Sequence, residues 1–292
     1  MRQTDPILLT GATGYVGRHL LDGLRSAGLS VRALTRTPAT ANLPSHVDVR
    51  RGDAVSGEGL ADALAGCATA YYLIHSMDSS GDFARRDRQA AENFGAAARA
   101  AGVRRVIYLG GLDGASEHLR SREEVATILA GHVPEAVHAR AAMVIGPGSA
   151  SFEILRHLVH RLPVMIAPKW VDTRSQPVAI SDVVRALVEL AEREEVPAEV
   201  QLGGADVLTY REMMRRYARL AGRRTPMIVK VPVLTPRLSS HWVALVTPVD
   251  RGLIGPLVDG LRSEMVVTSD PPAGLNDDPL SFDAAVREAI AE

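Results

Sequence analysis

The sequence contains almost no cysteine and no excess charge of either sign. Its single cysteine, Cys67, has no partner for an internal disulfide, which is typical of proteins in a reducing compartment. Lysine and arginine together number 33 against 34 acidic residues, so the net charge is only -1. Such a balance provides no global electrostatic field to hold nucleic acid or an anionic membrane.

Long apolar runs and targeting signals are also missing. The most apolar late stretch, residues 242–261, is interrupted by Pro248, Asp250 and Arg251. A membrane-spanning helix needs roughly 20 uninterrupted apolar residues, so this stretch does not qualify. The chain opens without the apolar core and cleavage site of a signal peptide. We therefore expect a cytoplasmic protein with neither nucleic acid nor a membrane among its partners.

Two kinds of catalytic site are not supported by the sequence. No Gly-x-Ser-x-Gly sequence is present, which excludes the nucleophile of an α/β-hydrolase. Glu153, His157 and His160 recur at helical spacing on one face, a geometry that could hold zinc. Neither a cysteine nor a further carboxylate is evidently directed there, so we predict no metal site.

The composition that remains is that of a globular protein, and its apolar residues follow an alternating pattern. The 292 residues are 46% hydrophobic and 23% charged, which excludes a disordered or fibrous chain. Short apolar runs predict buried parallel strands at residues 7–9, 31–34, 47–49, 70–74, 106–109 and 139–145. Helical patterns lie between several of these runs, at residues 15–27, 58–65 and 83–101. This alternation predicts an α/β fold with a doubly wound parallel sheet.

A glycine-rich loop directly follows the first predicted strand and opens the first helix. Its sequence is Thr10-Gly11-Ala12-Thr13-Gly14-Tyr15-Val16-Gly17. The first glycine permits a tight turn, the second lets backbone amides approach a pyrophosphate, and the third lets the helix pack on the strand. In this strand–helix context the motif predicts a Rossmann-type dinucleotide site. The predicted cofactor contacts in the loop are Gly11, Thr13, Gly14, Tyr15, Val16 and Gly17.

The end of the second strand indicates which dinucleotide is preferred. NAD-preferring sites place an Asp or Glu there, whereas this chain has Leu34-Thr35-Arg36-Thr37. A guanidinium at Arg36 can pair with a 2′-phosphate, so we predict NADP(H) in preference to NAD(H). Arg32 or Arg18 could share that role. Asp53, just past the third strand, is placed either to meet the adenine or to form a turn.

After residue 148 the pattern becomes less regular, which suggests a second unit. We predict an NAD(P)-binding domain over residues 1–148, with residues 178–203 returning to it. Residues 149–177 and 204–292 are then expected to form a smaller substrate lobe, or lid, over the carboxyl edge of the sheet.

Three segments resemble the atypical short-chain dehydrogenase/reductase superfamily, near its NmrA-like and NAD(P)H-binding branch. They are the glycine loop, Arg104-Arg105-Val106-Ile107-Tyr108-Leu109-Gly110-Gly111, and Gln176-Pro177-Val178-Ala179-Ile180-Ser181-Asp182-Val183. The resemblance covers most of the chain and implies NAD(P)(H) binding. Members of this superfamily include reductases, epimerases, dehydratases and non-catalytic redox sensors.

The Tyr-x-x-x-Lys pair usual in short-chain dehydrogenases is absent from this sequence. The chain has only two lysines, Lys169 and Lys230, and neither follows a tyrosine at that spacing. His118 and Arg122 occupy the region instead and could form a substitute pair on one helix face, although an exposed polar helix start, which Ser116 could cap, is the preferred interpretation.

His75 and Ser76 are the remaining candidates near the predicted nicotinamide. They end the fourth strand, at the carboxyl edge where the nicotinamide ribose is expected. Both are predicted cofactor contacts, and His75 is also a candidate proton donor. A strand-end histidine bound to backbone is the alternative for His75.

The substrate must contact the irregular part of the chain. Candidates are Ser149 and Phe152 after the sixth strand, and Trp170 and Gln176 in a proline-rich loop. Each could instead belong to the core of the lobe. We predict an NAD(P)H-dependent reductase of a small carbonyl or enone. A homodimer is a possible assembly. The alternatives are a non-catalytic dinucleotide sensor that binds a partner protein, and an NAD(P)-dependent epimerase or dehydratase.

Overall fold

The computed structural model describes residues 5–75, 82–112, 114, 116–230, 247–248, 254–255, 259–261 and 263–291. A parallel sheet of seven strands lies at its centre, in the order β11-β6-β5-β4-β1-β2-β3. The strands are β1 (Ile7–Thr10), β2 (Val31–Thr35), β3 (Asp48–Arg51), β4 (Thr69–Tyr72), β5 (Arg105–Gly111), β6 (Glu135–Ala141) and β11 (Glu199–Leu202). The strand order reverses direction at β1, which makes this a Rossmann-type doubly wound fold. The predicted fold class is confirmed.

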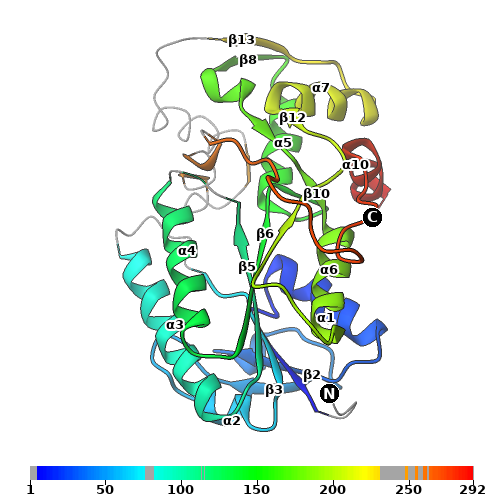
Figure 1. The fold of residues 1–292 in the computed structure, drawn as a ribbon. Coiled ribbons are helices and arrows are strands. Elements are labelled where there is room, and N and C mark those ends of the chain that lie inside the picture. Colours follow the sequence, from blue (N-terminus) through cyan, green and yellow to red (C-terminus); the bar gives the residue numbers. More distant parts are fainter. Residues whose placement is uncertain are drawn as a thin grey trace.

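Helices cover both faces of the sheet because the strands are apolar on both sides (Figure 1). One apolar core joins the sheet to α1 (Tyr15–Ser26) and α6 (Ile180–Glu192). The opposite core joins it to α2 (Leu60–Leu64), α3 (Phe83–Ala100) and α4 (Glu117–Ala130). The Ser116 hydroxyl accepts a hydrogen bond from the Leu119 amide at 3.3 Å, so it caps α4 as the sequence suggested.

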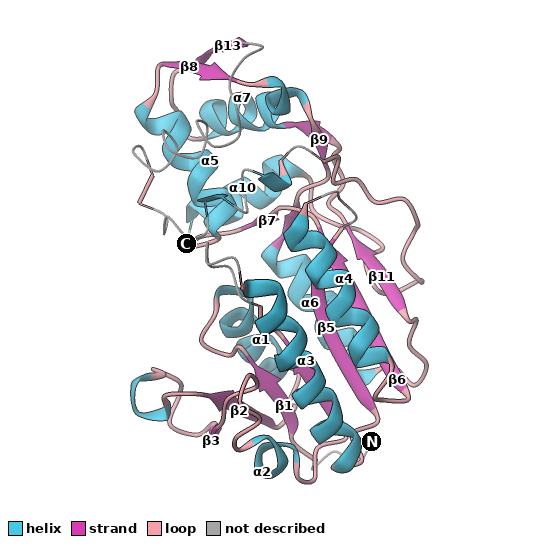
Figure 2. Ribbon diagram, turned by 90° about the vertical axis from the view of Figure 1, so that its left-hand side faces the viewer, coloured by secondary structure: helices cyan, strands magenta, loops and turns pink. Residues whose placement is uncertain are grey.

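A smaller lobe follows the carboxyl ends of the strands and has its own apolar core (Figures 1 and 2). Its helices are α5 (Ala150–Arg161), α7 (Tyr210–Leu220) and α10 (Phe282–Ala291), with the short 3-10 turn η2 (Lys169–Asp172). Its two-stranded pairs are β7 (Val144–Ile145) with β10 (Val178–Ala179), β9 (Arg174–Ser175) with β12 (Leu208–Thr209), and β8 (Val164–Ala167) with β13 (Met227–Lys230). A further 3-10 turn, η1 (Pro38–Thr40), follows β2.

The structure differs from the sequence prediction at the sixth strand and after it. The predicted strand 139–145 is two strands, since β6 ends at Ala141 and β7 turns away to pair with β10. Residues 199–202, which the apolar pattern did not indicate as a strand, pair with β6 as the edge of the central sheet. Among the described residues, no helix is both long enough and apolar enough to cross a bilayer.

Candidate functional site

The glycine-rich loop forms a closely packed turn between β1 and α1. Gly11 has a φ of +68°, and its carbonyl accepts a hydrogen bond from the Gly14 amide at 2.9 Å. A Cβ on Gly17 would lie 2.0 Å from the Gly11 carbonyl oxygen, so no larger residue fits there. No acidic side chain occupies the first turn of α1, whose amides are therefore available to an anion. This cradle fits the pyrophosphate of a dinucleotide.

Thr10 holds this loop against the neighbouring strand. Its hydroxyl donates to the Tyr71 carbonyl at 3.0 Å and accepts from the Leu73 amide at 2.9 Å. The bond to Tyr71 is buried, and the two bonds join β1 to the end of β4 and the residue after it. The loop and the residues after β4 are consequently fixed relative to each other.

The three arginines considered for the 2′-phosphate differ in their contacts. Arg36 is exposed and lines the cavity that begins at the glycine loop. Arg32 is tied to Asp48 at 2.7 Å and to the carbonyls of α2, so it is not free to share a phosphate. Arg18 donates to the Thr13 carbonyl at 2.9 Å, within the loop itself. Asp53 lines the cavity and also accepts from the Val55 amide at 2.8 Å, so it forms the expected turn.

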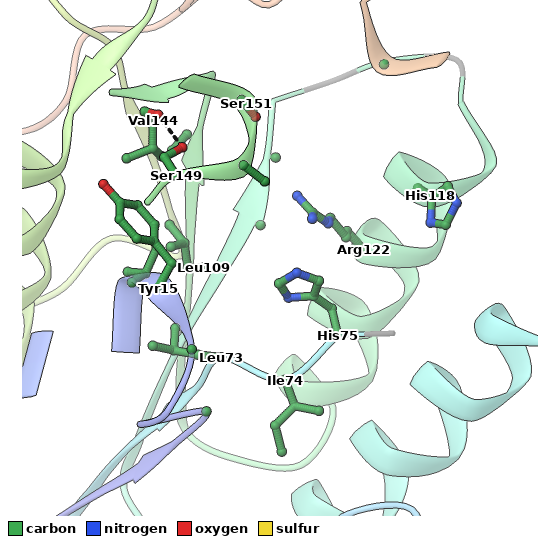
Figure 3. Close-up of a pocket in the computed structure, with 18 of the residues that line it drawn as sticks. Tyr15, Leu73, Ile74, His75, Leu109, His118, Arg122, Val144, Ser149 and Ser151 are labelled. Atoms are coloured by element: carbon green, nitrogen blue, oxygen red, sulfur yellow. Dashed lines mark hydrogen bonds between the residues drawn. The ribbon is translucent and has the colours of Figure 1, made fainter. Parts of the chain in front are cut away.

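One cavity of about 750 Å³ extends from the glycine loop into the lobe. Figure 3 shows its middle section, where Tyr15, His75, Arg122 and Ser149 surround the open space. The wall here consists of the strand ends of β4 and β5, the first turns of α4, and the loop before α5. When the pyrophosphate of a dinucleotide lies at the glycine loop, its nicotinamide would reach this section.

Two histidines contribute to the polar part of the wall, and neither favours protonation. The pKa of His75 is lowered from 6.5, by desolvation first and then by the positive charge of Arg122 and by His118. His75 faces the open cavity, so solvent reaches its ring even though protein surrounds it. His118 stacks on Phe83, with ring centroids 3.9 Å apart, and its pKa is also lowered, chiefly by desolvation. The lowered pKa values favour the neutral form of both imidazoles.

Arg122 is the cation of this section. Its side chain extends from α4 into the same open space as the His75 ring (Figure 3), and its Nη1 would lie 3.3 Å from a Cβ built on Gly111. Within the described part of the chain, no carboxylate or carbonyl accepts a hydrogen bond from this guanidinium. The carboxylate of the next residue, Glu123, accepts a hydrogen bond from Arg140 Nη2 at 3.0 Å. The Arg140 Nε also donates to the Gly111 carbonyl. These bonds fix α4 against β5 and so set the position of Arg122.

The far end of the cavity is apolar and is built by the lobe. Its wall comprises Met143, Val144, Ile154, Leu155, Leu158, Trp170, Tyr210, Met214, Leu261 and Met265. The indole of Trp170 meets the ring of Tyr210 edge-on, with centroids 6.0 Å apart. Its buried N–H has no acceptor among the described residues, so a ligand oxygen at this end would satisfy it.

The structure brings most of the predicted site residues to the cavity. The cofactor candidates of the glycine loop, together with Arg36, Asp53, His75, His118, Arg122, Ser149 and Trp170, all line it. Ser76 lies outside the described residues. The predicted substrate contacts Phe152 and Gln176 do not line the cavity, so those two predictions are corrected.

Both corrections have a packing reason. Phe152 is 1% exposed and packs against Tyr217 in the core of the lobe. Gln176 donates to the Gly204 carbonyl at 2.8 Å and accepts from the Val267 amide at 3.0 Å, so it fastens the C-terminal segment. Of the suggested zinc ligands, His160 lies 2.9 Å from the Tyr217 hydroxyl. The described residues contain no group of three or more side chains arranged to bind a metal.

Comparison with known proteins identifies the family. The model of the NAD(P)H-binding family matches residues 11–156. The chain belongs to this NAD(P)H-binding family. It is 30% identical over 289 residues to a ceramide reductase of Caulobacter vibrioides (strain NA1000 / CB15N), covering 91% of this chain and 87% of the relative. The matched region begins at Gly11 in the glycine loop and ends within α5.

Solved structures of low sequence identity share the fold over nearly the whole chain. A nucleoside-diphosphate-sugar epimerase from Staphylococcus aureus superposes with a TM-score of 0.77 at 19% identity, covering 97% of this chain and 100% of that one. Triphenylmethane reductase of Citrobacter sp., complexed with NADP(H), gives a TM-score of 0.76 at 19% identity, covering 97% and 99%. These proteins thus share the fold of this chain, and the family match confirms the predicted resemblance to NAD(P)H-binding proteins.

Several wall residues were not predicted from the sequence. Leu155 and Leu158 lie on an amphipathic helix, whose periodicity identifies a buried face but not what that face meets. Tyr210, Met214 and Met265 come from segments far away in the sequence. No local signal in a single sequence places such residues in one cavity.

Proposed function

We propose that the protein is an NADPH-dependent reductase of an apolar carbonyl or enone compound. The observation that carries this proposal is the continuous cavity, which joins the dinucleotide loop to an apolar chamber through a section that contains His75 and Arg122. A ligand in that chamber has a polar group at Arg122 and an apolar remainder against the lobe. The ceramide reductase relative supports a substrate with a long apolar part.

In this proposal the side chains supply charge and hydrogen bonds. The bound reduced nicotinamide supplies hydride. Arg122, whose guanidinium stays protonated, donates hydrogen bonds to the substrate oxygen and stabilises its developing negative charge. Neutral His75 donates a hydrogen bond to the same oxygen. As that oxygen takes the N–H proton, water that reaches the ring returns a proton to the imidazole, so water is the net proton source. No tyrosine is needed in this arrangement, because stabilisation and proton delivery are divided between two side chains.

The apolar chamber distinguishes this proposal from its alternatives. An epimerase or dehydratase acting on a polar sugar needs several hydrogen-bonding groups where this cavity presents Ile154, Leu158 and Met214. A non-catalytic sensor needs the dinucleotide loop but has no use for an apolar chamber next to it. The chamber is therefore most easily explained by an apolar substrate.

The test is NADPH consumption with a series of ketones and enones of increasing alkyl length. Each added methylene that enters the chamber is worth about 0.8 kcal/mol, so kcat/KM is expected to rise about fourfold per carbon until the chamber is full. NADPH binding measured by calorimetry serves as the control for an intact cofactor site. If NADPH binds and none of the compounds is reduced, the sensor alternative replaces this proposal.

Cofactor preference gives a second test. Arg36→Ala is expected to weaken NADPH binding about ten- to a hundred-fold, because a charge-assisted bond to the 2′-phosphate is worth about 1.5–3 kcal/mol. NADH affinity should stay unchanged. Arg51→Ala is the matched control, since Arg51 is exposed on the neighbouring strand and outside the cavity wall. Equal losses of NADPH and NADH affinity would show that Arg36 does not bind the 2′-phosphate.

A further inference from the structure

The paired strands β8 and β13 expose an apolar surface at the end of the lobe. Val164, Ile166, Met227 and Val229 are 48%, 56%, 61% and 44% exposed. The register pairs Met227 with Val164 and Val229 with Ile166, so the four side chains form two adjacent rows on one face. We call these four residues the outer face.

The opposite face of the same two strands is buried. Met165 and Ala167 are 2% and 3% exposed and belong to the core of the lobe, against which Ile228 also packs. A two-stranded pair with one side in water normally alternates apolar and polar residues. Here the water side is apolar as well, and an exposed apolar cluster of this kind marks a contact surface.

Cationic residues flank the two strands of the outer face in the sequence. Residues 161–171 and 219–230, which include and flank the two strands, contain no Asp or Glu. They contain six cationic residues, namely Arg161, Lys169, Arg219, Arg223, Arg224 and Lys230. The side chains of Arg219, Arg223 and Arg224 are exposed. The near-zero net charge of the whole chain therefore conceals a local excess of positive charge at this end.

We infer that the outer face docks on an anionic lipid surface. Two contributions drive binding at a membrane interface. Apolar side chains enter the headgroup boundary, and Lys and Arg side chains around them pair with lipid phosphates. A second copy of the chain fits less well, because a two-fold contact would bring two cationic borders together. This inference revises the expectation, drawn from net charge alone, that no membrane is a partner.

The place of the outer face in the fold agrees with this role. The β8–β13 pair lies at the end of the molecule opposite β2 and β3 (Figures 1 and 2). Beneath it, Met165 packs in the same core as Leu158 and Met214, which line the apolar end of the cavity. A membrane at the outer face would thus lie one layer of side chains away from the substrate chamber. The docking itself does not depend on the proposed reaction.

The test is sedimentation of the full chain with vesicles of phosphatidylcholine alone or with phosphatidylglycerol added. Binding to the anionic vesicles is expected to be at least tenfold tighter and to weaken as salt is raised. Arg223→Ser with Arg224→Ser should weaken it about thirtyfold, at about 1 kcal/mol per arginine. Ile166→Glu with Met227→Glu should abolish it.

The matched control is Ile290→Glu, which changes a residue of similar exposure, 47%, on α10. This variant should bind vesicles like the unchanged protein. Retained NADPH binding in every variant shows that each is folded, and it separates failure of docking from failure of the proposed reaction. Absence of vesicle binding overturns the inference. So does a stable dimer in solution that Ile166→Glu dissociates, because the outer face would then bind a second copy.

Discussion

Replacing Arg122 with methionine is expected to lower kcat/KM for ketone reduction by about 100- to 1000-fold, the size of effect found when one oxyanion-stabilising donor is removed. The guanidinium faces the cavity beside His75 and has no acceptor among the described residues. A substrate oxygen would be the hydrogen-bond acceptor for this guanidinium. The affinity for NADPH should change little, because the glycine loop and Arg36 hold the other parts of the cofactor.

Two variants make this result specific. Arg122→Lys keeps the positive charge but loses the planar fork, so it should recover part of the lost activity. Arg120→Met changes an exposed residue of the same helix that does not line the cavity, and it should leave kcat/KM unchanged. A similar loss in Arg122→Met and Arg120→Met would indicate damage to α4 instead of loss of charge stabilisation.

The same substitution should also move the pKa of His75, which a purely structural role for Arg122 would not explain. Arg122 lowers that pKa by repelling the proton, so its removal raises the pKa. Desolvation is the larger cause and remains, so the value should stay below 6.5. The titration of the His75 ring proton by NMR measures this shift. An unchanged pKa would mean that the Arg122 guanidinium does not lie close to the His75 ring in solution.

The central sheet and the dinucleotide loop could be predicted because their signals are local. The apolar runs have the length of buried strands. In the loop, Gly11 has a positive φ, and a Cβ on Gly14 or Gly17 would meet the Gly11 carbonyl within the same turn. The cap at Ser116 is local for the same reason. Each of these features is determined by residues fewer than ten positions apart in the sequence.

The substrate half of the site could not be predicted in this way. Phe152 and Trp170 are both large, buried aromatic residues, yet only Trp170 reaches the cavity. Which of them lines the cavity depends on how α5 and α7 pack, and those helices are about 50 residues apart in the sequence. Strand β11 was missed because Val200 and Leu202 alternate with the polar Glu199 and Gln201, a pattern too short to distinguish from a loop.

The segment that resembles the superfamily around Arg105 has a structural role that the resemblance did not indicate. The Arg105 side chain is fully buried and joins β5 to the end of α6. Its guanidinium donates to the carbonyls of Leu190 and Arg193, each at 2.8 Å, and to that of Glu194 at 3.2 Å. Its Nε donates to Glu135 at 2.7 Å. These are carbonyls that the end of a helix otherwise leaves without donors.

Arg105→Met is therefore expected to lower the free energy of unfolding by about 3–5 kcal/mol, because several buried helix-end carbonyls lose their donor at about 1–3 kcal/mol each. Urea denaturation measures this loss as a lower midpoint with an unchanged slope. The neighbouring Arg104 is the matched control, since it binds the same Glu135 at 2.6 Å but is 43% exposed. Arg104→Met should cost less than about 1 kcal/mol, as exposed ion pairs do. Equal losses in the two variants would mean that the bond to Glu135, and not the cluster of helix-end carbonyls, is what Arg105 contributes.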